Sequence, residues 1–155
     1  MKKILLFSLA LVCLSLVGCK KDEPKEEFKL TGTYWATESY VKGSITTWYY
    51  YRVWHFTSET EAEEIRYSTD TQRVNISKGD DPAKYGKIPS DNDKVIVHVT
   101  SLNYPKISTY ETITYYYTQV TEETNYRDGE FITEEHFKLT YPKTGITDYF
   151  YKINR

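Results

Sequence analysis

The sequence is poor in cysteine: it has only Cys13 and Cys19, both close to the N-terminus. A domain formed by the later residues therefore has no disulfide and depends on its own core for stability. The one long apolar run covers residues 4–17. This is shorter than the roughly 20 residues that a helix needs to cross a bilayer. Following Lys2 and Lys3, the run is typical of the apolar region of a signal peptide.

Catalytic motifs are also missing. The chain has no G-x-S-x-G nucleophile, no H-E-x-x-H, no Walker loop and no dinucleotide fingerprint. Its three histidines, His55, His98 and His136, are scattered over separate predicted strands, whereas a histidine metal site needs two or three to converge. We therefore expect no enzymatic activity, no cofactor and no metal site.

Cys19 ends the segment LSLVGC, in which an aliphatic residue lies three positions before the cysteine and a glycine directly before it. This segment resembles the lipobox of bacterial lipoprotein signal peptides. The resemblance implies cleavage between Gly18 and Cys19, thioether lipidation of the Cys19 thiol, and an N-terminus acylated with palmitate-type chains. Two or three such chains hold a protein stably on a membrane. The alternative is an ordinary secretory signal with an incidental cysteine.

Residues 20–27 carry seven charges and one proline. Such a segment buries no apolar surface and is expected to be an extended, disordered spacer. The acidic Asp22 and Glu23 also resemble the export signal that directs lipoproteins of Bacteroidetes-type bacteria to the outer face of the outer membrane. We therefore expect a lipid-anchored outer-membrane protein, on either the periplasmic or the cell-surface face. The predicted segments are a signal peptide (1–18), a lipidated tether (19–29) and one β domain (30–155).

The mature chain of 137 residues has the size of one domain. Loss of Lys2 and Lys3 leaves 18 basic against 22 acidic residues, a net charge of −4. A weakly acidic surface argues against nucleic acid as a partner.

Tyrosine dominates the mature chain, with 16 residues, beside three tryptophans and many threonines. These residue types favour a half-buried β-sheet surface. Alternating residue patterns and turn residues predict eight strands, at 33–41, 46–56, 62–68, 94–102, 107–120, 121–127, 130–141 and 147–153. A ninth, weak strand is predicted at 73–76, and a long loop at 77–93. Residues 61–66 also fit a short helix, and we favour the strand.

Asp128-Gly129 lies between two β-like runs and predicts a two-residue type I′ hairpin turn. That register places Tyr126 opposite Phe131. It also predicts one core-facing stripe, formed by Tyr116, Val120, Tyr126, Phe131, Phe137, Leu139 and Tyr141.

About eight sequential antiparallel strands can close into an up-and-down barrel or pack as a β-sandwich. Residues 30–35 (LTGTYW) resemble the start of the first strand in lipocalin-like proteins of the calycin group, in which a tryptophan follows a glycine by two positions. Here Tyr34 holds that position and Trp35 is next. The resemblance implies a barrel in which the first and last strands pair and Lys152 or Arg155 lies over one of these rings. Small bacterial lipoproteins with one lipocalin-like domain look like this chain.

The strand around residues 48–56 is aromatic on both faces. One face is expected to be core, and the other is either shielded by a neighbouring element or exposed for a ligand or partner. The predicted ligand-binding candidates are Trp35, Trp48, Tyr50, Trp54, Tyr115 and Tyr117.

Two functions fit these observations. The first is a membrane-anchored, non-catalytic barrel that binds a small apolar or aromatic ligand, which predicts an internal cavity lined by Trp and Tyr. The alternative is a lipoprotein that contacts another envelope protein or a glycan, which predicts a filled core and an exposed aromatic patch.

Overall fold

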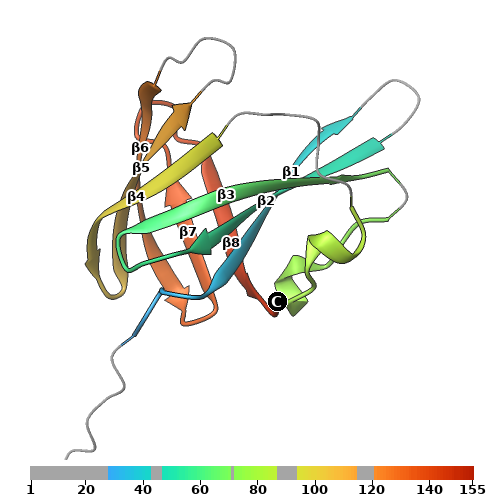
Figure 1. Ribbon diagram of the computed structural model, residues 1–155, viewed down its shortest axis with the longest axis horizontal. Helices are drawn as coiled ribbons and strands as arrows, with labels where there is room; N and C mark the ends of the chain where they lie inside the picture. Colours follow the sequence, from blue (N-terminus) through green and yellow to red (C-terminus); the bar gives the residue numbers. More distant parts are fainter. Residues whose placement is uncertain (1–27, 43–46, 71, 87–93, 115–120) are drawn as a thin grey trace, which may run out of the picture.

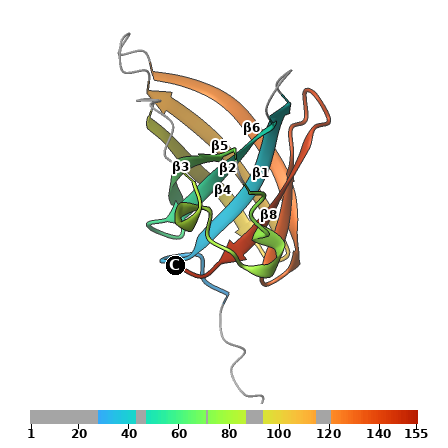
Figure 2. The same cartoon turned by 90° about the vertical axis from the view of Figure 1, so that its right-hand side faces the viewer.

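A computed structural model describes residues 28–155, except 43–46, 71, 87–93 and 115–120, and without the side chains of 40–42 and 121–124. Eight strands form one closed antiparallel barrel in chain order (Figures 1 and 2). Two short 3-10 helices, η1 (Ile76–Lys78) and η2 (Pro82–Lys84), lie between β3 and β4. The strands are β1 (Tyr34–Lys42), β2 (Thr47–Phe56), β3 (Glu61–Thr69), β4 (Lys94–Asn103), β5 (Lys106–Thr114), β6 (Thr121–Thr133), β7 (His136–Thr140) and β8 (Thr147–Ile153).

The barrel prediction is confirmed, and the sandwich is excluded because β1 and β8 pair directly. Tyr34 is opposite Ile153, and Trp35 is opposite Lys152. The guanidinium of Arg155 lies 5.1 Å from the centre of the Tyr34 ring, within cation–π distance. The contact that the lipocalin-like resemblance implied is therefore present, with Tyr34 as the aromatic partner.

Alternating burial shows why these sequences form strands. In the first half of β4, Val95, Val97 and Val99 are buried, while the residues between them are less buried. Residues 61–66 are strand rather than helix, as favoured, and pair with β2 through a tight connection in which Thr57 N–H donates to the Glu61 carbonyl at 3.0 Å.

The predicted turn at Asp128-Gly129 is wrong, because both residues lie inside β6 and the chain reverses at residues 134–135. Asp128 and Gly129 pair with β5 on one side and with β7 on the other. A Cβ on Gly129 would lie only 1.9 Å from the carbonyl oxygen of Lys138. The glycine therefore allows β7 to approach closely, and this double pairing outweighs the local Asp-Gly turn preference.

The orientation of β6 side chains differs accordingly from the predicted one. Tyr126 is 60% exposed on the outer wall, while Arg127 is 1% exposed. Phe131, Phe137 and Leu139 are buried, as the predicted stripe requires. Tyr116 and Val120, which were placed on the same stripe, lie outside the described residues.

One hydrophobic cluster fills part of the barrel interior, and we call it the aromatic plug. Its centre is a set of rings from four strands that meet at centroid distances of 4.3–4.8 Å. The fully buried members include Trp35, Trp54, Phe56, Phe137, Leu139 and Phe150.

A second hydrophobic cluster lies outside the barrel wall. The segment of residues 72–86, which contains η1 and η2, lies against the outside of the barrel (Figure 2) and covers this cluster. Tyr51 and Val53 of β2 pack there against Val74 and Ile76. Val74 N–H donates to the Tyr51 hydroxyl at 2.7 Å. The outward aromatic face of β2 is thus shielded by residues 72–86, which we call the cover. Residues 73–76 belong to the cover and do not form the weak strand predicted for them.

Candidate functional site

The structure places Trp35 and Trp54 as cross-strand partners in the aromatic plug. Both rings are fully buried, and Trp54 contacts Phe150 with ring centroids 4.3 Å apart. Trp35 Nε1 donates to the Thr33 hydroxyl at 2.7 Å. These two candidates therefore help to fill the barrel, and their rings contact protein side chains.

Trp48 and Tyr50 alternate with outward residues on β2 and share the face that carries Arg52 and Trp54. Trp48 is exposed and Tyr50 is half-buried, so both lie beyond the plug, toward the N-terminal end of β2. Four of the six candidates are thus on two paired strands. Tyr115 and Tyr117, and the lipidation site Cys19, lie outside the described residues.

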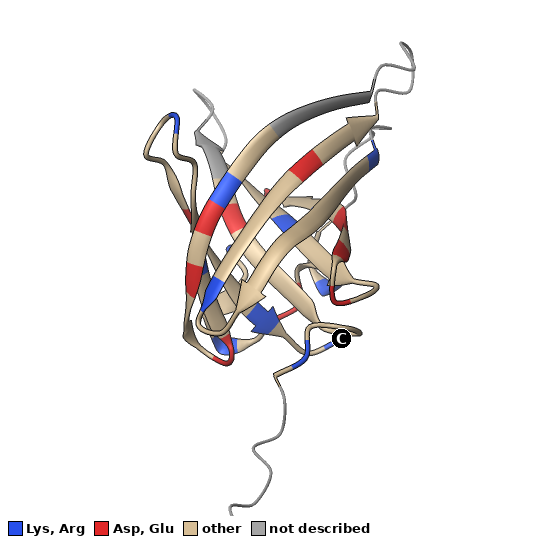
Figure 3. Ribbon diagram, turned by 90° about the vertical axis from the view of Figure 1, so that its left-hand side faces the viewer, with Lys and Arg blue, Asp and Glu red and all other residues tan. Residues whose placement is uncertain are grey.

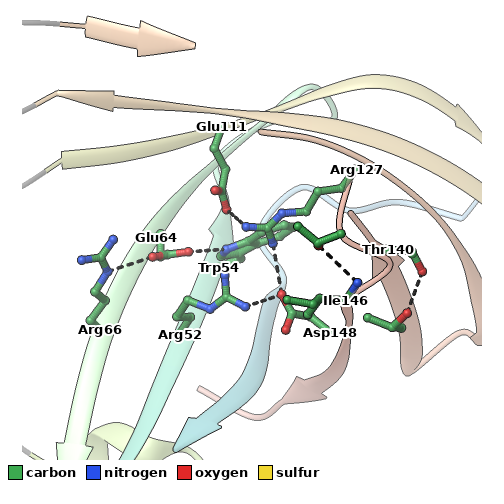
Figure 4. A network of polar contacts seen from close by, with 11 residues as sticks. Arg52, Trp54, Glu64, Arg66, Glu111, Arg127, Thr140, Ile146 and Asp148 are labelled. Carbon is green, nitrogen blue, oxygen red and sulfur yellow. Dashed lines mark hydrogen bonds and ion pairs between the residues drawn. The ribbon is translucent and has the colours of Figure 1, made fainter. Parts of the chain in front are cut away.

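A layer of ion pairs crosses the barrel next to the plug (Figure 4). Arg127 of β6 binds Glu111 of β5 and lies 3.5 Å from Asp148 of β8. Arg52 of β2 binds the same Asp148 oxygen at 2.5 Å. We call this set, with Glu64 and Arg66, the charged layer. It connects side chains from five strands, β2, β3, β5, β6 and β8.

The charged layer is joined to the aromatic plug by Trp54 and Glu64. Trp54 Nε1 donates to Glu64 at 3.0 Å, and Arg66 Nε donates to the other Glu64 oxygen at 2.9 Å. The Arg127 guanidinium also lies 4.1 Å from the ring centre of Tyr141. Three arginines thus meet three carboxylates, so the layer is close to neutral when all six are ionised.

Burial sets the protonation behaviour of this layer. It raises the pKa of Glu111, against the opposing effect of Arg127, so Glu111 takes up a proton more readily than an exposed glutamate. Burial alone would lower the pKa of Arg52, but Asp148 and Glu64 outweigh that effect and raise it. Arg52 therefore stays charged.

Solvent reaches the layer on one side. The Arg52 and Asp148 side chains are 19% and 16% exposed, whereas Arg127 is 1% exposed. The described pairing between β3 and β4 covers residues 61–63 and 96–98, and Glu64 follows directly after the last pair. The charged layer therefore lies between the aromatic plug and the end of β2 that carries Tyr50 and Trp48.

The histidines lie on the outer wall, each stacked on a tyrosine. His55 stacks on Tyr34 at 4.1 Å, His98 on Tyr110 at 4.6 Å and His136 on Tyr151 at 4.3 Å between ring centroids. Among the described residues, no group of three or more His, Cys, Asp or Glu side chains is arranged to hold a metal ion.

A groove of about 590 Å³ lies on the outer wall, between the segment 72–86 and strands β1 and β8. Tyr149, which is exposed, and Tyr151 form one side of it. Arg73 and Glu38 contribute a polar side and are paired at 2.9 Å. This groove is of ligand size and has aromatic and hydrogen-bonding walls.

Sequence reasoning missed the charged layer. The available signal was charge at inward positions: Arg52 alternates with Tyr50 and Trp54, and Glu64 lies opposite Trp54. Arg127 could not be found this way, because the misplaced turn reversed its orientation.

Comparisons with known proteins gave no relative: no family model matches the chain, and neither a curated protein nor a solved structure matches it. In the described part of the chain, no helix has the length and apolarity needed to cross a membrane. The class defined by the structure is a closed eight-stranded antiparallel barrel with a charged layer above an aromatic plug.

Proposed function

We propose that the chain is a membrane-anchored envelope lipoprotein whose barrel is a non-catalytic binding domain for a small apolar or aromatic ligand. The anchor rests on the lipobox that ends at Cys19 and on the charged tether that follows it. Asp22 and Glu23 favour the outer membrane as its location, on the periplasmic or the cell-surface face.

The observation that carries the binding role is the asymmetry of the lumen. One part is filled by the aromatic plug, and the charged layer next to it is partly open to solvent. Trp48 and Tyr50 follow Arg52 on the same face of β2. A ligand with an apolar or aromatic body would pack on these rings, and a polar end would meet Arg52 and Asp148. The Nε of Arg127 is buried and has no hydrogen-bond partner among the described residues, so the charged layer holds one unused donor.

Native mass spectrometry of the detergent-extracted mature protein tests both parts of the proposal. The expected spectrum contains the mass of the acyl chains and an additional small molecule that is lost on denaturation. The Trp48→Ala variant should lose the small molecule, whereas Tyr126→Ala, which changes the outer wall, should retain it. An acylated protein without a bound molecule, from cells and after incubation with amphipathic aromatic probes, would contradict the ligand part alone.

A second candidate is the interaction lipoprotein that recognises an envelope protein or a glycan. The observation that favours it is the outer groove beside Tyr149 and Tyr151, combined with the filled plug. It predicts that Tyr149→Ala weakens binding of an envelope glycan or protein in a solution titration, while Trp48→Ala leaves it unchanged. If Trp48→Ala weakens binding and Tyr149→Ala does not, the result supports a binding site in the lumen.

A further inference from the structure

The chain enters the barrel at one particular end, which we call the closed end and define by the β2–β3, β4–β5 and β6–β7 turns. Phe28, the first described residue, packs there with its ring 5.1 Å from Tyr104 and 4.7 Å from Phe131. Glu59 in the β2–β3 turn accepts hydrogen bonds from the backbone N–H groups of Leu30 and Thr31, at 3.1 and 3.0 Å. The N-terminal segment is therefore fixed at this end (Figures 1 and 2).

The closed end exposes apolar and aromatic side chains. Tyr104 in the β4–β5 turn and Ile132 near the β6–β7 turn are each 49% exposed. A groove of about 630 Å³ opens beside Phe28 and Tyr104. Val99 and Leu102 form the rest of its apolar wall, and its polar wall consists of Glu59, Thr60, Thr100, Ser101 and Asn103. Apolar and aromatic side chains gathered on an exposed surface indicate a contact with a partner or a membrane.

We propose that this closed end rests on the lipid bilayer, with Phe28, Tyr104 and Ile132 at the boundary between headgroups and acyl chains. The inference rests on the proposed lipid anchor at Cys19, which brings this end to a membrane. Aromatic side chains favour this boundary because their rings are apolar while a tyrosine hydroxyl remains hydrated. The opposite end of the barrel, and the lumen above the charged layer, then face away from the membrane.

The length of the tether supports this orientation. Nine peptide steps separate Cys19 from Phe28, so this segment spans at most about 30 Å. A ten-residue strand such as β2, tilted by about 40°, spans roughly 25 Å along the barrel axis. The far end could touch the bilayer only with a nearly extended tether, whereas the closed end reaches it without stretching.

Charge contributes little to the contact. Lys29 and Lys106 are exposed at the closed end, but so are Glu134 and Glu135, and Figure 3 shows basic and acidic residues interspersed there. Attraction to anionic lipid is therefore weak, and membrane contact should depend little on ionic strength.

The mature chain allows a direct test, because its only cysteine is the one that lipidation consumes. Tyr104→Cys and the matched control Ile146→Cys, in the β7–β8 turn at the opposite end, are labelled with the environment-sensitive fluorophore NBD. The lipidated proteins are reconstituted into phosphatidylethanolamine–phosphatidylglycerol vesicles. We expect NBD emission at residue 104 to rise about two-fold or more and to be quenched by nitroxide lipids, with little change at residue 146. Salt should alter neither result.

The outcomes separate this inference from the proposed anchor. Proteins that float with vesicles but give equal NBD signals at the two positions, or a larger signal at residue 146, overturn the orientation while the anchor stands. Absence of flotation contradicts the anchor. A second experiment then tests whether the closed end binds a membrane by itself. The unlipidated mature protein, with Cys19→Ser and the NBD label at residue 104, is mixed with excess vesicles. A response at residue 104 that is lost on Ile132→Ser supports membrane contact, and no response refutes it.

Discussion

Arg155 binds both carboxylate oxygens of Asp81, with N–O distances of 2.9 and 2.8 Å, and so ties the last residue of the chain to the segment that covers the outer wall. The same guanidinium donates to the Tyr67 hydroxyl at 2.9 Å and lies over the Tyr34 ring. One side chain thus connects β1, β3 and the cover. The second hydrophobic cluster, which contains Tyr51 and Val74, lies beneath this connection.

Asp81→Asn should lower the free energy of unfolding at pH 7 by about 1–3 kcal/mol, because a charge-assisted pair becomes a neutral contact. Burial alone would raise the pKa of Asp81, but Arg155 and the Ala83 N–H hold it below its usual value. A lowered folded-state pKa adds stability above the ordinary value of about 4, which is lost as the pH falls through the folded-state pKa. The difference between variant and wild type should therefore narrow below pH 4 in urea titrations. The exposed Asp128→Asn serves as control, and an equal effect there would contradict the prediction.

Arg127→Met should destabilise the barrel by about 3–5 kcal/mol at pH 7, because it leaves Glu111 buried without its partner. Burial already raises the pKa of Glu111, and loss of Arg127 removes the main opposing effect. A raised folded-state carboxyl pKa means that stability falls as the pH rises through the unfolded-state and then the folded-state value. The variant should therefore regain stability between pH 7 and pH 5, measured by urea unfolding.

Two further variants identify the cause. Arg127→Met combined with Glu111→Gln should recover part of the loss at pH 7 and lose the added pH dependence. Lys138→Met removes the exposed pair with Glu130 on the outer wall and should change stability little. An Arg127→Met protein with wild-type stability, or with no response to pH, would show that the charged layer is not a connected unit.

Most of the barrel could be predicted because period-2 burial is a local property. Val95, Val97 and Val99 of β4 alternate with less buried residues, and the predicted bounds of β8 are the observed ones. Closure was predictable only through the resemblance of residues 30–35, since pairing of β1 with β8 joins segments more than 100 residues apart.

The sequence indicates Arg52 and Glu64 as inward charges, but their pairing with Arg127 could not be predicted, because it depends on orientation across the lumen. One wrong local inference, the turn at Asp128-Gly129, placed Tyr126 inside and Arg127 outside. The sequence does not decide whether Tyr51 is shielded, for a similar reason: residues 72–86 contact β2 only through tertiary packing. Trp35 and Trp54 were sensible candidates by residue type, but only the structure shows that Phe137 and Phe150 surround them.

Gly129→Ala should destabilise the barrel by about 2 kcal/mol or more, because its Cβ would overlap the Lys138 carbonyl and force β6 and β7 apart. Gly145→Ala is the matched control. Gly145 has a φ of +71°, but an added Cβ there would meet open space, so its cost should be about 1 kcal/mol from backbone strain. Equal losses of unfolding free energy in the two variants would contradict the close approach of β7.

Cys19→Ser should abolish lipidation, because a serine hydroxyl cannot form the thioether that the lipobox implies. Metabolic labelling with an alkyne-bearing fatty acid should mark the wild type and leave the variant unmarked. The variant should also move from the membrane fraction to the soluble fraction, with unchanged thermal stability of its β domain. Undiminished label on the variant would refute the lipobox interpretation.

Truncation after Tyr149 should unfold the whole domain instead of fraying one end. It removes Phe150, a fully buried ring of the plug, whose centroid lies 4.3 Å from that of Trp54 and 4.8 Å from that of Phe137. It also removes every described β8 partner of β1, so two strand edges become unpaired at once. Circular dichroism and NMR spectra should show loss of the folded β domain. Removal of Asn154 and Arg155 alone leaves β8 intact and should lower the Tm without unfolding. A truncated protein that keeps dispersed NMR resonances would show that the aromatic plug holds the other strands together without barrel closure.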